Sequence, residues 1–279
     1  MDIQPAYSEP FMPDALTMVP AVPGLDVVTA EWAWGGSTGA GVKVAVIDSG
    51  IDASHAAIGG SVAGYVGVTE DAEGAPIFDF EPHGDDYGHG TACAGIVRSL
   101  APEAELHSIK VLGRRSGKAS VFGAGLQWAI DHGMQVCNMS LGTTKRDYYV
   151  MLHELADQAY FRNVMLVTAA NNLPAPSFPS VYASVISVGA HAVQDPTLFY
   201  YNPSPPVEFG ALGVGVRVAW REGDWLTATG NSFAAPHITG LIARILSKHP
   251  GLTVFHVKMI LRTLAANVRH GGASAAETR

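Results

Sequence analysis

The chain is poor in cysteine and has no long apolar run. Its 279 residues include two cysteines, Cys93 and Cys137, which cannot supply a disulfide framework or a four-ligand zinc site. Each lies within an apolar segment, which predicts a buried free thiol. No run approaches 18 apolar residues, so the sequence excludes a membrane-spanning helix.

Charge is also scarce, and its balance is negative. Charged residues make up 15% of the chain, and 17 Lys+Arg against 25 Asp+Glu give a formal net charge of −8. Phosphate binding needs clustered positive charge, so nucleic acid is excluded as a partner. Apolar residues make up 48%, enough for a large core and too many for an intrinsically disordered chain.

The first residues lack the basic and apolar regions of a secretory signal, so we expect a cytoplasmic protein. The alternative is a secreted protein from which a leader has been removed. Five prolines within the first 23 residues predict an extended arm over residues 1–24, because proline interrupts helices and strand ladders. We expect one folded unit over residues 25–268 and a flexible tail over residues 269–279.

The rest of the chain alternates between two kinds of pattern. Apolar runs suited to parallel strands buried on both faces occur at residues 42–47, 106–112, 134–141, 163–170 and 184–190. Helical patterns cover residues 25–34, 121–132, 148–162 and 232–265, the last with a break at 249–251. The alternation predicts an α/β fold: a single domain with a doubly wound, mainly parallel sheet and helices on both faces.

Residues 69–86 stand apart because they hold seven acidic side chains, and we expect an acidic surface loop there. Two of these acids, Asp85 and Asp86, come just before His89, a candidate catalytic residue. They suggest the hypothesis that the substrate carries basic residues near the reacting bond.

Three segments carry residues suited to catalysis. Asp48 ends the first apolar run in IDSGID, His89 lies between glycines in GHGTACAG, and Ser232 begins a helical pattern in GNSFAAPH. Taken alone, Asp48 could be a turn former, His89 a surface histidine and Ser232 a helix cap. Together they are the acid, base and hydroxyl of nucleophilic acyl transfer, because a serine needs a base and the base needs an orienting carboxylate.

The order Asp, His, Ser within these motifs resembles the subtilisin-like serine peptidases, from about residue 25 to residue 265. The resemblance implies that Ser232 is the nucleophile, His89 the general acid/base and Asp48 the carboxylate that orients it. Asn172, in VTAANN, matches the family's oxyanion donor. The backbone N–H of Ser232 would be the second donor.

The resemblance also implies an extended peptide substrate that binds as an added strand, with no cofactor. The residues that it places along the substrate are Ser140, Leu141 and Gly142 at the first pocket, Arg115, Ser116 and Gly117 along the opposite edge, Phe122 at the pocket four residues upstream of the bond, and Tyr87 at the second position. Many secreted members carry a calcium loop after the catalytic histidine. The segment from Gly90 to Leu112 has no such insertion, so we expect no metal there.

Four residues depart from the family's usual motifs: Ala92, Asn171, Asn231 and Phe233. None is a reacting group, but the segment after Asn172 is short, and the preference of the first pocket stays open. We expect a serine endopeptidase, with a dedicated role in processing a precursor peptide as a hypothesis. The alternative is a catalytically silent scaffold that binds peptides. A lipase is excluded because Ser232 does not lie in a G-x-S-x-G turn.

Overall fold

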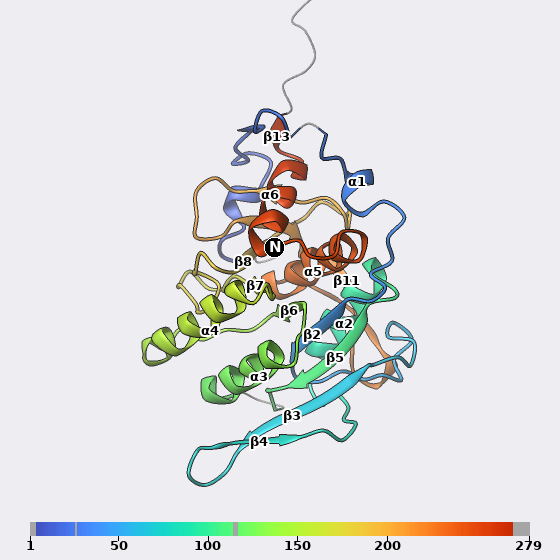
Figure 1. Cartoon of the computed structure of the whole chain (residues 1–279), viewed down its shortest axis with the longest axis vertical. Helices are drawn as coiled ribbons and strands as arrows, with labels where there is room; N and C mark the ends of the chain where they lie inside the picture. The colour runs from blue at the N-terminus through green and yellow to red at the C-terminus, as the bar shows by residue number, and fades with distance from the viewer. Residues whose placement is uncertain (1–3, 26, 114–116, 270–279) are drawn as a thin grey trace, which may run out of the picture.

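A nine-stranded sheet runs through the centre of the computed structural model, which describes residues 4–25, 27–113 and 117–269 (Figure 1). The strands lie in the order β4-β3-β5-β2-β6-β7-β8-β10-β9. Their bounds are β2 (Lys43–Asp48), β3 (Gly64–Glu70), β4 (Pro76–Asp79), β5 (Glu105–Lys110), β6 (Val136–Met139), β7 (Met165–Ala169), β8 (Ile186–His191), β9 (Tyr200–Tyr201) and β10 (Phe209–Leu212). All neighbours pair in parallel except at the two edges, where β4 and β9 are antiparallel. The predicted mainly parallel sheet is confirmed.

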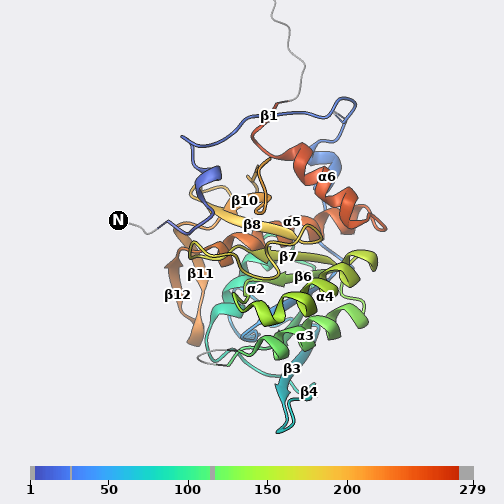
Figure 2. The same cartoon turned by 90° about the vertical axis from the view of Figure 1, so that its left-hand side faces the viewer.

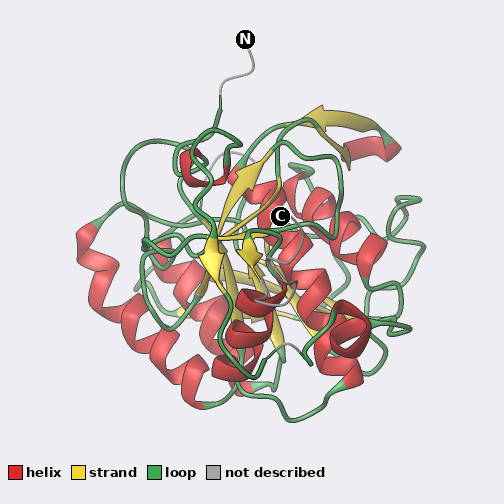
Figure 3. Cartoon of the chain, turned by 90° about the horizontal axis from the view of Figure 1, so that it is seen from above, coloured by secondary structure: helices red, strands yellow, loops and turns green. Residues whose placement is uncertain are grey.

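Helices cover both faces of this sheet, as predicted for a doubly wound fold (Figure 2). On one face, α3 (Ala119–Asp131) packs on β2 and β3, and α4 (Tyr149–Phe161) packs on β7. On the other face, α2 (His89–Leu100) packs on β2, and α5 (Asn231–Lys248) packs on β6, β7 and β8. Seen from above, the helices surround the strands (Figure 3). The family resemblance and this architecture agree on a subtilisin-like fold.

The remaining elements are short or peripheral. They are α1 (Ala30–Trp34), α6 (Val254–Leu264), the strands β1 (Val19–Pro20), β11 (Val216–Ala219), β12 (Trp225–Ala228) and β13 (Val268–Arg269), and the 3-10 helices η1 (Glu9–Phe11), η2 (Arg146–Tyr148) and η3 (Arg221–Gly223). Of the helices in the described part of the chain, none combines the length and the apolar character that a bilayer crossing needs.

Strand β2 shows why the core divides into two layers. Val44 and Val46 point into the core beneath α2 and α5, whereas Ala45 and Ile47 point into the core beneath α3 and α4. All four are fully buried, which explains why the sequence of β2 is apolar without alternation. The two cysteines lie in these layers as buried free thiols, as predicted.

Two sequence predictions of local structure are wrong in part. The helix expected over residues 25–34 is limited to α1, because Thr29 caps it by accepting a hydrogen bond from Trp32 N at 3.1 Å. The acidic segment 69–86 is not all loop, since it includes the end of β3 and all of β4, which form an antiparallel hairpin. Val66 and Val68 anchor that hairpin in the core, and Asp71, Glu73 and Asp79 are exposed, whereas Glu70 is covered by its contacts with Lys118 and Ser120.

The N-terminal arm lies on the folded unit and is held at several points. β1 pairs in parallel with β13, so that Pro20 is opposite Arg269. Arg269 therefore lies in a strand, although the sequence placed it in the tail, and residues 270–279 lie outside the described residues. Phe11, in η1, is 1% exposed and packs near β8. The arm is thus a packed part of the structure.

Candidate active site

Asp48 and His89 form a hydrogen-bonded pair at the carboxyl edge of the sheet, in which the carboxylate is buried and the imidazole is partly exposed. Asp48 ends β2 and is fully buried, and both of its carboxylate oxygens lie 2.9 Å from His89 Nδ1. Oδ1 also accepts a hydrogen bond from Ser49 N at 2.8 Å. Because Nδ1 faces a carboxylate, it carries the proton in the neutral ring, and the lone pair of Nε2 is free to act as a base.

The start of α2 places His89 against the end of β2. Asp85 Oδ1 accepts a hydrogen bond from Gly88 N at 2.7 Å, just before the helix begins. A side chain on Gly90 would be impossible, because its Cβ would lie 2.1 Å from Gly50 O. The glycine therefore lets the helix and the strand end approach closely enough for the Asp–His pair to form.

Asp85 and Asp86 are engaged by the protein itself. Asp85 Oδ2 accepts hydrogen bonds from both Thr91 N and Thr91 Oγ1 at 2.8 Å, which caps the first turn of α2. Asp86 pairs with Lys110 at 3.0 Å. These contacts give the two acids structural roles and leave the hypothesis of basic substrate residues without support from the structure.

The environment of His89 favours its protonated form. Burial lowers the pKa of His89, but the nearby Asp48 carboxylate outweighs this and holds the pKa well above the ordinary 6.5. Cys93 lies on the same side of the ring, with Sγ 4.0 Å from Nδ1. Burial raises the pKa of this thiol, so it is neutral near pH 7 and Asp48 supplies the charge.

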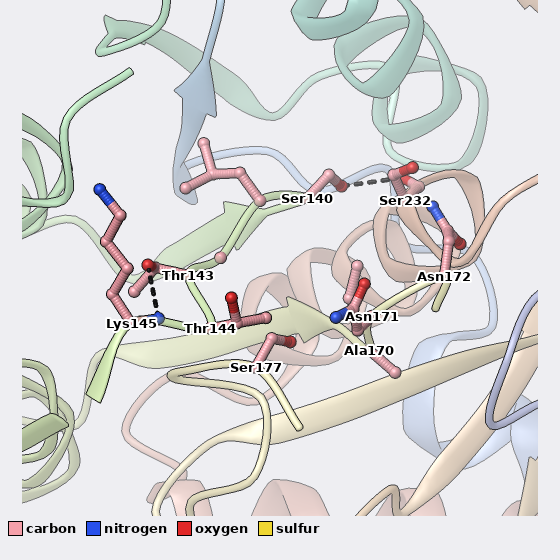
Figure 4. Close-up of a pocket in the computed structure, with 12 residues that line it drawn as sticks. Ser140, Thr143, Thr144, Lys145, Ala170, Asn171, Asn172, Ser177 and Ser232 are labelled. Carbon is pink, nitrogen blue, oxygen red and sulfur yellow. Dashed lines mark hydrogen bonds between the residues drawn. The ribbon is translucent and has the colours of Figure 1, made fainter. Parts of the chain in front are cut away.

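A chain of buried hydrogen bonds fixes Ser232 at the start of α5. Its carbonyl oxygen accepts from Ser140 Oγ at 2.8 Å (Figure 4) and from Cys93 Sγ at 3.5 Å. Ser140 Oγ in turn accepts from Asn138 Nδ2 at 3.1 Å, and Asn138 Oδ1 accepts from Thr239 Oγ1 at 3.0 Å. These bonds tie the start of α5 to the end of β6, and Cys93 ties it to the helix of His89.

Asn172 lies beyond the end of β7, with a side chain of defined orientation. Its Oδ1 accepts a hydrogen bond from Asn231 N at 2.8 Å, and because a backbone N–H can only donate, this fixes which end of the amide is oxygen. A Cβ built on Gly230 would lie 3.3 Å from Ser232 Oγ and 3.5 Å from Asn172 Nδ2. The hydroxyl and the amide nitrogen thus face the same space beside Gly230.

A cavity of about 330 Å³ opens beside these groups (Figure 4). Of the residues predicted from the sequence, Ser140, Leu141, Gly142, Asn172 and Ser232 line it. The sequence reasoning missed Thr143, Thr144, Lys145, Asn171 and Ser177 as lining residues. The first three could have been found as the continuation of the Ser140 segment. Ser177 had no local signal, because it reaches the cavity through the pairing of Thr143 with Phe178.

A second cavity, of about 570 Å³, shares Leu141, Gly142, Thr143 and Lys145 with the first. Gly117 and Phe122 line it, so the structure brings them to the same groove as the first cavity. Arg115 and Ser116, expected on the edge of that groove, lie outside the described residues.

Tyr87 lies on the other side of the site. Its ring is 46% exposed and centred 6.3 Å from the His89 ring and 5.9 Å from Trp220. The structure therefore places Tyr87 beside the imidazole, and its predicted role at the second substrate position stays a prediction.

Comparison with known proteins agrees with this architecture. The profile of the subtilase family matches residues 39–277. Subtilisin DY of Bacillus licheniformis is 34% identical over 84% of this chain and 86% of its own, and alkaline elastase YaB of Bacillus sp. (strain YaB) is 31% identical over 96% and 71%. Minor extracellular protease Epr of Bacillus subtilis (strain 168) is 31% identical over 85% of this chain and 37% of its own.

These similarities, on this fold, define the protein as a serine endopeptidase. The chain belongs to the subtilase family. The family and the enzyme class predicted from the sequence are both confirmed.

Proposed function

We propose that this peptidase uses Ser232 as nucleophile, His89 as general base and Asp48 as the carboxylate that orients the base. The observation that carries this assignment is the pair in which both oxygens of the buried Asp48 carboxylate lie 2.9 Å from His89 Nδ1. That contact leaves Nε2 to take the proton of Ser232 Oγ as the hydroxyl oxygen bonds to the substrate carbonyl carbon. The imidazolium then gives its proton to the leaving amine, and water releases the acyl group by the reverse sequence.

We assign stabilisation of the tetrahedral intermediate to Asn172 Nδ2 and the backbone N–H of Ser232. The bond from Asn231 N to Asn172 Oδ1 supports this, because it turns the amide nitrogen toward the space shared with Ser232 Oγ. The helix N-terminus adds partial positive charge where the oxyanion develops. Loss of the corresponding donor in a subtilisin costs about 2.7–4 kcal/mol, and we expect a similar loss here.

The substrate is proposed to bind as an extended strand along the two cavities. Ser140, Leu141 and Gly142 would form one wall, and Gly117, with Arg115 and Ser116, the opposite edge. Phe122 would meet a side chain upstream of the bond, and Tyr87 the residue next to the acyl position. The position of Gly117 and Phe122 on a cavity that adjoins the first supports this arrangement.

The first cavity favours small polar or acidic substrate side chains. Among the described residues that line it, Lys145 alone is charged, and most others are serine, threonine, asparagine or small apolar residues. Figure 4 shows Lys145 across the cavity from Ser232. Lys145 also borders the second cavity, so we propose that its positive charge influences substrate residues at both places.

We propose that the charge of Lys145 at the first cavity makes cleavage selective, which suits the processing of one precursor peptide better than general degradation. As for location, one relative is named an extracellular protease, which favours secretion over the cytoplasmic location predicted from the sequence. Fractionation of the producing cells tests the location.

For domain organisation, we propose that residues 25–268 form the catalytic unit and that residues 1–24 pack on it as an arm.

Cleavage of a proteome-derived peptide library tests the proposed reaction. We expect internal cleavages with a narrow preference at the residue whose carbonyl is attacked, and none with Ser232→Ala. A broad cleavage pattern would contradict the processing role. Peptides that bind without being cleaved by the wild-type protein would identify the silent scaffold instead.

A further inference from the structure

The N-terminal arm reaches the proposed oxyanion site through Ala6. Ala6 N donates a hydrogen bond to Asn172 O at 3.0 Å, and Ala6 O accepts one from Asn231 Nδ2 at 2.9 Å. Residue 6 is thus bonded on both sides to the two segments that carry the proposed oxyanion donor and the nucleophile. These contacts join parts of the chain more than 150 residues apart.

Asn231 is the centre of this arrangement. Its side chain is fully buried, and Oδ1 accepts from Ala190 N at 2.9 Å. Besides its bond to Ala6, Nδ2 donates to Asn171 O at 3.0 Å. Its backbone N–H holds Asn172 Oδ1, as described above. One residue therefore connects β8, the loop after β7 and the arm, and sets the direction of the Asn172 amide.

The arm has its own anchor near this contact. The ring of Phe11 lies over Gly189 and Gly210, which are opposite each other in β8 and β10. A Cβ on Gly210 would lie 2.2 Å from the ring, and one on Gly189 would lie 2.8 Å from it. Because these two paired glycines have no side chains, the Phe11 ring can pack directly on the sheet. This contact fixes the arm five residues from Ala6.

We propose that Asn231 and Ala6 are positioning residues for the oxyanion donor, so that the arm is a working part of the active site. This rests on the proposed role of Asn172. Neither Asn231 nor any described residue of the arm is among the residues that line the two cavities. Their role is to hold the Asn172 loop and prevent its amide from turning away. Loss of either contact should lower kcat with little change in KM, because the oxyanion forms only in the transition state.

A cycle of single and double variants tests this. Ala6→Pro removes the N–H that donates to Asn172 O, and Ala15→Pro is the matched control, because Ala15 N donates within the arm, to Met12 O, away from the site. We expect Ala6→Pro to lower kcat roughly 10-fold, within the loss that misplacement causes. In an Asn172→Ala background the same change should lower kcat less than about twofold, because the group being positioned is gone.

Equal losses from Ala6→Pro in both backgrounds, or equal losses from Ala6→Pro and Ala15→Pro, would overturn the positioning role. Asn231→Ala, carried through the same cycle well below its melting temperature, decides the question if Ala6→Pro does not fold. If Asn172→Ala itself keeps full kcat, the proposed function of Asn172 fails, which is a separate outcome from failure of the arm.

Discussion

The thiol of Cys93 lies behind the imidazole of His89, with Sγ 4.0 Å from Nδ1, on the helix that the two residues share at a spacing of one turn. Nδ1 is already bonded to Asp48, so the thiol has no proton to exchange in the reaction. A heavy metal bound to this sulfur would nevertheless crowd the imidazole. We therefore expect modification of Cys93 to inhibit the enzyme, although the thiol takes no part in the reaction.

We predict that Cys93→Ala keeps activity within about twofold and loses inhibition by mercurials. Cys137→Ala is the matched control, because Cys137 is equally buried but lies in the other core layer. Its sensitivity to mercurials should equal that of the wild type. A folded but inactive Cys93→Ala protein would contradict this account and argue for a chemical role of the thiol.

The raised pKa of His89 predicts how the site responds to pH. In Ser232→Ala protein, which cannot digest itself, NMR titration of the imidazole should give a pKa above 6.5. Asp48→Asn should lower that pKa, because the charge that stabilises the imidazolium is removed, and in the active enzyme it should lower kcat roughly 10⁴-fold. A pKa unchanged by Asp48→Asn would show that Asp48 does not control the base.

The raised pKa of His89 also makes the free energy of unfolding depend on pH. The folded state binds this proton more tightly than the unfolded chain, so the pair contributes stability below about pH 6.5. That contribution is lost as the pH rises through the raised pKa of His89. Melting curves of Ser232→Ala with and without His89→Ala, recorded across this range, should therefore converge toward alkaline pH.

Much of the fold could be predicted from the sequence because parallel strands buried on both faces are continuously apolar. β2, with Val44 to Ile47 in alternate core layers, is such a strand. Strands β9, β10, β11 and β12 were not predicted, because they are two to four residues long and have no sustained pattern. The triad segments could be found because each has small neighbours, such as Gly90, that only close packing requires.

The parts of the site that were missed depend on contacts between distant segments. Ser177 enters the first cavity through pairing at Thr143, and Ala6 reaches Asn172 from the far end of the chain. Asn231 could be recognised from sequence as a departure from the family, but its bonds to the arm required the folded structure. The sequence shows that Asp85 is acidic, but only the structure shows its two hydrogen bonds to Thr91 in α2 and its two to Tyr87 N and Gly88 N just before that helix.

Chelation tests the expectation that the fold needs no metal. In the described part of the chain, one group of three His, Cys, Asp or Glu side chains could share an ion, and it is Asp48, His89 and Cys93 themselves. We predict that EDTA changes activity and melting temperature little, because on this expectation chelation removes no ligand that stabilises the native state. A fall of many degrees that calcium restores would contradict this.

Charge reversal tests the selectivity assigned to the first cavity. Lys145→Glu should lower kcat/KM for substrates with an acidic residue at the scissile carbonyl and raise it for basic ones, each by up to about fivefold, because exposed pairs contribute about 0.2–1 kcal/mol. Lys43→Glu is the control, since Lys43 begins β2 at the opposite edge of the sheet. Parallel changes in both variants would indicate a general effect of net charge.

Covalent labelling by a fluorophosphonate tests the central assignment most directly, because it reports which oxygen is the activated nucleophile. Peptide mapping by mass spectrometry should locate a single adduct on Ser232 of the wild-type protein. The adduct should be absent from Ser232→Ala and formed much more slowly in His89→Ala, with the fold of Ser232→Ala retained. An adduct on another residue, or labelling of Ser232→Ala at the wild-type rate, would contradict Ser232 as the nucleophile.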